Sequence, residues 1–198
     1  VSIVENEDGE ETKIEVIYNH EGKIIKVDDV KLNRNMDLLE NVYVVVFSPE
    51  DLRIVKDGPE HRRRFIDREL CQIKPVYYSD LGNYKKVLKQ RNALLKDEKA
   101  DRTLFDVFDE TLSDYGMRIV NERKKFINSI YEICSGIHSD VTGGRENLDI
   151  KYETEVKSRD QFNEKLKEGF SQDVLKGYTS FGPHKDYLGI KINGKDIR

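Results

Sequence analysis

An unbroken helical pattern in the second half of the chain constrains the fold more than any other feature. It runs from about Thr103 to Gly136. Large apolar side chains recur there every three or four residues, the spacing of one helix face; they are Phe108, Leu112, Tyr115, Ile119, Phe126, Ile130 and Ile137. A helix of this length would extend roughly 50 Å. It must therefore bury its apolar stripe against another element.

The preceding segment supplies a suitable partner. Pro75 suits the first position of a helix, and a helical stripe follows it at Tyr77, Leu81, Tyr84, Leu88 and Leu95. Residues 97–102 leave room only for a short turn between the two helices. Helices joined by a short turn pack as antiparallel neighbours, so the sequence predicts a long antiparallel helix pair.

Two further helices are predicted before this pair. Ser48 can cap a helix that has Pro49 in its first position, and Glu50 and Asp51 suit the positive end of the helix dipole. This helix is expected to end near Lys56, with Gly58 as its stop. Another is expected over 59–73, again starting at a proline.

Residues 1–47 indicate a β-rich unit. Ile14, Val16 and Tyr18 alternate with polar residues, which is the period of a strand. A second strand carries Ile25 and Val27, and Gly22 supplies the turn of a hairpin over 20–23. A short helical stretch at 36–39 is expected to lead to 42–47, whose β-branched run favours a strand buried on both faces.

The pattern returns to strands after Gly143 and Gly144. We expect a strand over 148–156, a helix over 158–170 and a strand over 188–192. The predicted fold class is therefore α+β: a β-rich part at 1–47, a helical lobe at 48–143, and strands and a helix at 144–198 that return toward the first part.

Composition limits the class of protein. Hydrophobic residues make up 37% and charged residues 36% of the chain, with a formal net charge of -4. No apolar run is long enough to span a membrane, and the N-terminus lacks the pattern of a signal peptide. The sequence begins with Val and enters a strand pattern at once, so we expect a piece of a longer protein. Cys71 and Cys134 are expected to be reduced thiols of a cytoplasmic protein.

Several catalytic motifs are absent from these 198 residues. Neither a phosphate-binding loop of the form G-x-x-x-x-G-K-[ST] nor a dinucleotide-binding fingerprint occurs. The histidines at 20, 61, 138 and 184 have no second metal ligand at a suitable spacing, so no metal site is predicted. No serine or cysteine lies in a nucleophile motif.

Two basic clusters are candidate binding residues. The run 85–96 carries five cations and no acid, namely Lys85, Lys86, Lys89, Arg91 and Lys96; it predicts contact with DNA or a partner, or only a solvated helix face. Arg62, Arg63 and Arg64 cannot all point the same way on a helix. We expect at least one to point inward to a carboxylate or phosphate from elsewhere, while another faces solvent.

The order of these motifs resembles the RecF family of bacterial DNA-repair ATPases. The shared motifs are FSPEDL, GPEHRRRFID, YKKVLKQRNALLK and GPHKD before a strand and ING. The resemblance implies the β-rich part of an ABC-type ATPase lobe with an inserted helical lobe. It also implies ATP and Mg, an ATP-dependent homodimer, and binding to single-strand/double-strand DNA junctions. Members act with RecO and RecR to load RecA in gap repair, replication and the SOS response.

The resemblance also suggests roles for individual residues. Glu50 or Asp51 would occupy the Q-loop, which senses the nucleotide. The three arginines and His184, Lys185 and Asp186 would lie near the nucleotide or a lobe interface. The family pattern GPHRDD reads GPHKDY at 182–187, so the planar fork of an arginine is lost at Lys185.

The Walker A, signature and Walker B motifs of such ATPases do not occur in this sequence. We therefore expect no ATP hydrolysis and no cofactor in this chain by itself. Two alternatives stay open. The chain could be a helical protein-interaction module, or part of the head of another SMC-like ATPase.

Overall fold

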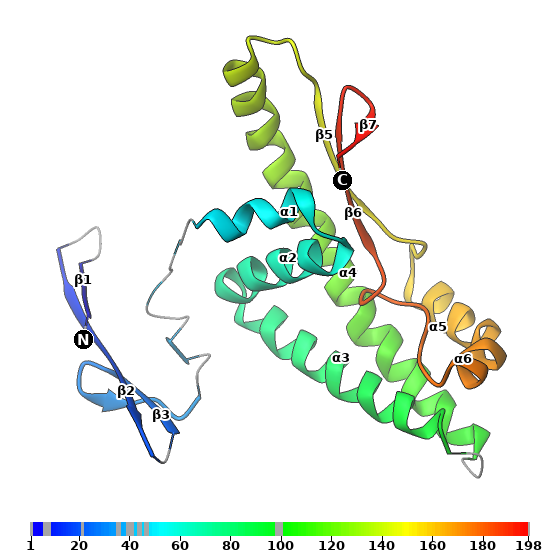
Figure 1. The fold of residues 1–198 in the computed structure, drawn as a ribbon. Helices are drawn as coiled ribbons and strands as arrows, with labels where there is room; N and C mark the ends of the chain where they lie inside the picture. Colours follow the sequence, from blue (N-terminus) through cyan, green and yellow to red (C-terminus); the bar gives the residue numbers. More distant parts are fainter. Residues whose placement is uncertain are drawn as a thin grey trace.

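A computed structural model describes most of the chain. The described residues are 2–5, 9–20, 22–34, 37–38, 42, 45, 48–97 and 101–197. They form two antiparallel sheets and a set of helices (Figure 1). One sheet precedes the helices in the sequence, and the other pairs strands from both sides of the last two helices.

The first sheet has four antiparallel strands in sequence order. They are β1 (Ser2–Glu5), β2 (Glu11–Asn19), β3 (Gly22–Val27) and β4 (Val30–Lys31). The predicted hairpin is confirmed, because Asn19 pairs with Gly22, whose φ of 125° is a conformation that suits glycine. Ile14 pairs with Val27, and both side chains are buried. Tyr18, near the hairpin end, is exposed.

The link between this sheet and the helices is described only in part. The short helix expected at 36–39 has both end residues, Met36 and Leu39, outside the described residues. Four of the six positions of the strand expected at 42–47 also lie outside them. Val42 and Val45 are described, neither is in a strand, and Val45 is 94% exposed. At these two positions the expectation of a buried strand is wrong, because no described strand pairs with them.

Proline marks the start of three of the helical elements, at Pro49, Pro59 and Pro75, as predicted. The helical elements are the 3-10 helix η2 (Pro49–Leu52) and the α-helices α1 (Arg53–Lys56), α2 (Pro59–Ile73), α3 (Pro75–Leu94) and α4 (Arg102–Thr142). Proline lacks an N–H and has a fixed φ, so it suits the first turn, where no intrahelical partner is needed. The bounds predicted for α2 from the sequence are therefore met at both ends.

The antiparallel pair of α3 and α4 is confirmed. Near the start of α3, the hydroxyl of Tyr77 lies 3.1 Å from Nε of Arg123, midway along α4. Near the end of α3, Nε of Arg91 lies 2.6 Å from Oδ1 of Asp109, early in α4. The contacts run in opposite order along the two helices, and Figure 1 shows them side by side.

The buried face of α4 differs from the predicted stripe. Leu112 and Ile119 are fully buried, as expected, but Phe108 is only partly buried and Ile137 is 58% exposed. The buried residues of the helix are Phe105, Asp109, Leu112, Ser113, Gly116, Ile119, Val120, Arg123 and Ile127. Polar side chains belong to this face, so a pattern built on apolar residues alone misplaces it.

The long helix also extends past its predicted end. Gly136 stays helical, and α4 continues to Thr142. Gly143 then adopts a left-handed conformation with φ of 61°, which ends the helix. Forty-one residues correspond to a helix of about 60 Å.

The C-terminal part combines a small sheet with two short helices. Its elements are β5 (Leu148–Glu153), α5 (Arg159–Glu168), α6 (Phe170–Lys176), β6 (Tyr187–Ile192) and β7 (Lys195–Asp196). The strands pair antiparallel in the order β5-β6-β7. The two predicted strands are present, although β5 ends three residues before its predicted end, and α5 corresponds to the helix predicted over 158–170. The helix α6 after Gly169 was not predicted. The domain boundaries near residues 47 and 143 stay predictions.

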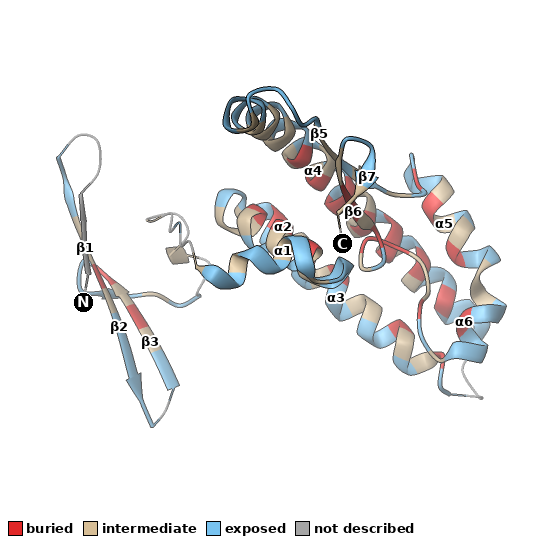
Figure 2. Ribbon diagram, turned by 45° about the horizontal axis from the view of Figure 1, so that its top comes forward, coloured by how far each residue is buried: buried red, intermediate tan, exposed pale blue. Residues whose placement is uncertain are grey.

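One hydrophobic core joins the helices to this second sheet (Figure 2). It contains Ile66 of α2, Tyr84 of α3, Leu112 of α4, Phe162 of α5 and Leu188 of β6, among others. A Cβ on Gly116 would lie 2.6 Å from the Phe162 ring, so glycine allows α5 to approach α4. Among the described residues, no helix is long and apolar enough to cross a bilayer.

Candidate functional site

The two residues predicted for the Q-loop have different environments. Oδ2 of Asp51 accepts a hydrogen bond of 2.8 Å from the backbone N–H of Ser48, the capping-box arrangement that holds the helix start. This hydrogen bond, with a smaller contribution from Arg68, lowers the pKa of the Asp51 carboxyl. Glu50 is 76% exposed and pairs with Arg53 at 3.2 Å. Asp51 therefore stabilises the helix start, and Glu50 is available to solvent.

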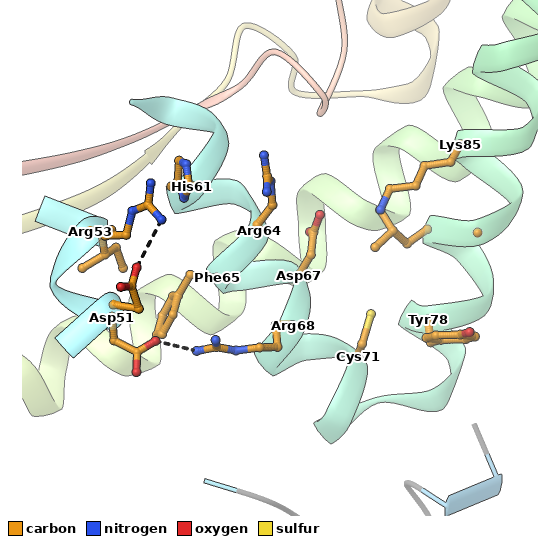
Figure 3. Close-up of a pocket in the computed structure, with 14 residues that line it drawn as sticks. Asp51, Arg53, His61, Arg64, Phe65, Asp67, Arg68, Cys71, Tyr78 and Lys85 are labelled. Atoms are coloured by element: carbon orange, nitrogen blue, oxygen red, sulfur yellow. Dashed lines mark hydrogen bonds and ion pairs between the residues drawn. The ribbon is translucent and has the colours of Figure 1, made fainter. Parts of the chain in front are cut away.

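A first pocket opens beside these residues (Figure 3). It has a volume of about 720 Å³. Figure 3 shows Arg64, Arg68 and Lys85 around it, with Asp51 paired to Arg68 at 3.5 Å. The pocket lies between the η2–α1 segment, α2 and α3. It brings the predicted Q-loop residues together with one of the three arginines and with the first lysine of the basic run.

The three consecutive arginines point in different directions, as predicted. Arg62 is 2% exposed and donates to the backbone carbonyls of Ile54, Leu188 and Ile197 at 2.7–2.9 Å. Arg64 is exposed and pairs with Glu60 of its own helix. The expectation that the inward arginine meets a carboxylate is wrong. Strand and helix ends present unpaired carbonyls at this point, and these satisfy the guanidinium instead.

Arg63 and the segment 182–187 form a second cluster. Nη1 of Arg63 donates to the backbone carbonyl of Asp186 at 2.8 Å. The Asp186 carboxylate is buried and accepts from the Tyr152 hydroxyl at 2.5 Å, and burial raises the pKa of this carboxyl. His184 lies 2.8 Å from the Tyr84 hydroxyl and 3.0 Å from the carbonyl of Thr179. Burial lowers the pKa of this imidazole to about 4.

Sequence reasoning did not identify Arg123, which holds this cluster together. Its guanidinium is 2% exposed and donates to the Asp67 carboxylate at 2.8 Å and to the carbonyl of Pro183 at 2.6 Å. It lies four residues after the buried Ile119, on the same helix face. The sequence signal that could have identified Arg123 is a cation in the middle of a buried apolar stripe, because a buried charge needs a partner.

A second pocket, of about 450 Å³, brings several predicted residues together. Arg63, His184 and Lys185 line it, from α2 and from the segment before β6. Lys85 of α3 lines it too. The sequence separates these side chains by up to about 120 residues, and the helix pair and the second sheet place them around one cavity.

The basic run at 85–96, which covers the end of α3 and the turn after it, divides into surface and core residues. Lys85, Lys86, Lys89 and Lys96 are exposed. Arg91 is 0% exposed and forms ion pairs with Asp109 at 2.6 Å and Asp173 at 2.8 Å. The assignment of Arg91 as a DNA or partner contact is therefore wrong in this structure. The run looks uniform in sequence, but position 91 lies on the packed face of the helix.

Cysteine and metal chemistry are not prominent in the described residues. Cys71 and Cys134 are free thiols, as expected. Burial raises the pKa of the Cys71 thiol to about 11, so it is a poor nucleophile at neutral pH. Among the described residues, no group of three His, Cys, Asp or Glu side chains could hold a metal ion. Within the described ranges, the side chains therefore offer no such set of ligands for Mg.

Comparison with known proteins agrees with the fold and the motifs. No protein-family model matches the chain. It is 42% identical over 192 residues to the DNA replication and repair protein RecF of Clostridium acetobutylicum, covering 94% of this chain and 53% of that protein. It is 38% identical over 203 residues to the RecF of Clostridium novyi, covering all of this chain and 56% of that one.

Solved structures show the same relation. The chain matches a structure of the recombination mediator protein RecF with ATP with a TM-score of 0.90 at 34% identity, covering 99% of this chain and 56% of that one. A RecF-ATPrS structure matches with a TM-score of 0.89 at 34% identity, over 98% and 55% of the two chains. Both are structures of RecF in the RecFOR pathway.

These matches identify the class of protein to which the chain belongs. The helical lobe and its return strands correspond to part of an ABC-type ATPase. The chain is homologous to RecF, and it spans about half the length of the RecF relatives that it matches.

Proposed function

We propose that the chain is part of a RecF-like, ATP-dependent DNA-binding protein that acts in DNA replication, recombinational gap repair and the SOS response. Its homology to RecF at about 40% identity over nearly all of its length carries this proposal. In this proposal the whole protein binds ATP with Mg and dimerises. It recognises single-strand/double-strand junctions and works with RecO and RecR to load RecA in the cytoplasm.

The exposed lysines at the end of α3 and in the turn just after it support a role in DNA binding. Lys85, Lys86, Lys89 and Lys96 are exposed, and within the described part of the chain none of the four forms an ion pair. Lysines without carboxylate partners can bind DNA phosphates and release the counterions condensed on them. This release of counterions dominates DNA binding that is independent of base sequence.

A salt titration tests this proposal. The affinity for a fluorescent junction oligonucleotide is measured by anisotropy at several salt concentrations. Log affinity should fall linearly with log salt, and each lysine of the face changed to Gln should reduce the slope by up to about 1. The matched control changes four exposed lysines elsewhere, Lys23, Lys56, Lys157 and Lys195, to Gln. The affinity of this control is compared with that of a variant in which all four lysines of the face are changed to Gln. Equal losses of DNA affinity in the two variants would refute a DNA-binding face at residues 85–96.

A second function is favoured by one surface feature. Near the end of α4, Ile133, Ile137 and Val141 lie one turn apart and are 65%, 58% and 79% exposed. An exposed apolar stripe of this kind is typical of a protein-interaction surface, which is the function of a helical interaction module. Absence of salt-dependent DNA binding in the titration above would favour this second function, or the head of another SMC-like ATPase, over the first.

A further inference from the structure

The second pocket carries more positive charge than its own carboxylates neutralise. Arg63, Arg64, Lys85, Arg123 and Lys185 line it, and its only lining carboxylates among the described residues belong to Glu60 and Asp67. Both carboxylates already have partners in this structure. Oε1 of Glu60 lies 2.5 Å from Arg64, and Oδ1 of Asp67 lies 2.8 Å from Arg123.

Three cations are left without a carboxylate in the described part of the chain: Arg63, Lys85 and Lys185. The Arg63 guanidinium donates a hydrogen bond to a neutral acceptor, the carbonyl of Asp186. Burial, and then repulsion from Arg123, lowers the pKa of Arg63. A partly buried cation beside another cation is electrostatically unfavourable, and a bound anion would relieve this repulsion.

The walls of the pocket are held in place by hydrogen bonds. Arg123 donates to the carbonyl of Pro183 at 2.6 Å, and His184 is bonded to the hydroxyl of Tyr84 at 2.8 Å. The side chains of Leu81 and Ile119 add an apolar lining. A positioned guanidinium and two lysines at an apolar-walled cavity are suited to an oxyanion, because arginine can donate two parallel hydrogen bonds to it.

We propose that this pocket binds a phosphate-class oxyanion through Arg63, Lys85 and Lys185. A phosphodiester of a nucleic acid and a free phosphate or small phosphate ester share this chemistry. Lys85 belongs both to this pocket and to the lysine face at residues 85–96, but Arg63 and Lys185 lie on other segments and test the pocket separately. The two ideas can therefore fail separately.

Isothermal titration with inorganic phosphate tests the site in the 198-residue chain, with chloride at equal ionic strength as the reference. Lys85→Gln and Lys185→Gln should each raise the Kd for phosphate about tenfold, which corresponds to about 1.4 kcal/mol. The matched control is Lys157→Gln, an exposed lysine outside both the pocket lining and the lysine face at residues 85–96, which should leave the Kd unchanged. Arg63→Lys should also weaken binding, because it keeps the charge and loses the fork.

The same variants decide between the two sources of the anion. If Lys185→Gln weakens junction DNA binding and phosphate competes with the DNA, the occupant is a nucleic-acid phosphodiester. If DNA binding is unchanged while phosphate binding is lost, the occupant is a free phosphate or small ester. The absence of phosphate binding by the wild-type chain would overturn the proposal. An equal loss of phosphate binding in Lys157→Gln would also overturn it, given far-UV circular dichroism that shows all variants folded.

Discussion

Arg91 and Asp109 join α3 to α4 through a fully buried ion pair, with Nε of Arg91 2.6 Å from Oδ1 of Asp109. The same guanidinium donates through Nη1 to Asp173 of α6 and to the hydroxyl of Thr179, both at 2.8 Å. One side chain therefore fastens α6 to the pair of α3 and α4. Removing one partner of such a pair leaves uncompensated buried charge, which costs more than the pair itself contributes.

Arg91→Ala should lower the free energy of unfolding by about 3–5 kcal/mol, because Asp109 and Asp173 lose their cation in the core. Urea denaturation followed by circular dichroism measures the change. Lys89→Ala, on the exposed face of the same helix, is the control and should change stability by less than about 0.5 kcal/mol. If both variants were equally stable, Arg91 would be a surface residue after all.

The buried face of α4 predicts different losses of stability for two alanine substitutions. Leu112 is 0% exposed, whereas Phe108 is only partly buried. Leu112→Ala should cost about 2–5 kcal/mol of stability, since it leaves a cavity in the core. Phe108→Ala should cost clearly less, despite removing a larger side chain. The reverse order in thermal or urea unfolding would restore the stripe expected from the sequence.

His184 should make the stability of the protein depend on pH. Its folded-state pKa is about 4, below the ordinary value of 6.5, because the imidazole is buried. As pH falls from about 6.5 toward 4, the unfolded chain takes up a proton that the folded chain does not, so stability is lost over this window. The loss should amount to about 1–3 kcal/mol at pH 4 relative to pH 7.

Other buried groups oppose this effect, so a control variant is needed. Burial raises the pKa of the Asp186 and Asp109 carboxyls, and acidification therefore favours the fold through them. His184→Gln retains both carboxylates and removes only the imidazole. Urea unfolding at pH 7, 6, 5 and 4 should show a flatter loss of stability toward acid in His184→Gln than in the wild type. Parallel curves for the two proteins would contradict a role of His184.

Glu50 and Asp51 should respond differently to removal of their carboxylates. Asp51→Ala should destabilise the fold by about 0.5–2 kcal/mol, since it removes the hydrogen bond that caps η2. Glu50→Ala should change stability by less than about 1 kcal/mol, because its exposed ion pair with Arg53 contributes little.

The Q-loop resemblance adds an activity prediction for Glu50. In a full-length RecF-like protein that carries this segment, Glu50→Ala should lower ATP turnover more than ATP binding. Turnover and nucleotide affinity are measured separately, and the rate is expressed per folded molecule. An unchanged rate per folded molecule would leave Glu50 with only its effect on the helix dipole.

The 198-residue chain by itself should not hydrolyse ATP. Phosphoryl transfer needs a phosphate cradle, a metal site and a positioned water, and the G-x-x-x-x-G-K-[ST] cradle does not occur in this sequence. A coupled assay for released phosphate on the purified chain should stay at the rate of a buffer blank. Turnover that rises in proportion to protein concentration and survives further purification would show otherwise.

The sequence by itself determined the local elements of this protein. Pro49, Pro59 and Pro75 mark helix starts because proline fixes φ and lacks an N–H, and both effects act within one turn. Gly22 marks the hairpin for an equally local reason, its positive φ. The antiparallel helix pair also follows from local patterns, because a short connection leaves two apolar stripes no other partner.

Tertiary structure decided which charged side chains are buried. Arg91 lies among four lysines in the sequence, yet it packs against Asp109 and Asp173 while the lysines stay in solvent. Arg123 likewise depends on Asp67 and on the carbonyl of Pro183, which lies 60 residues further along the chain. A buried charge is tolerated only where partners from other segments meet it. No local pattern specifies that meeting, so the two pockets and their lining emerged only from the folded chain.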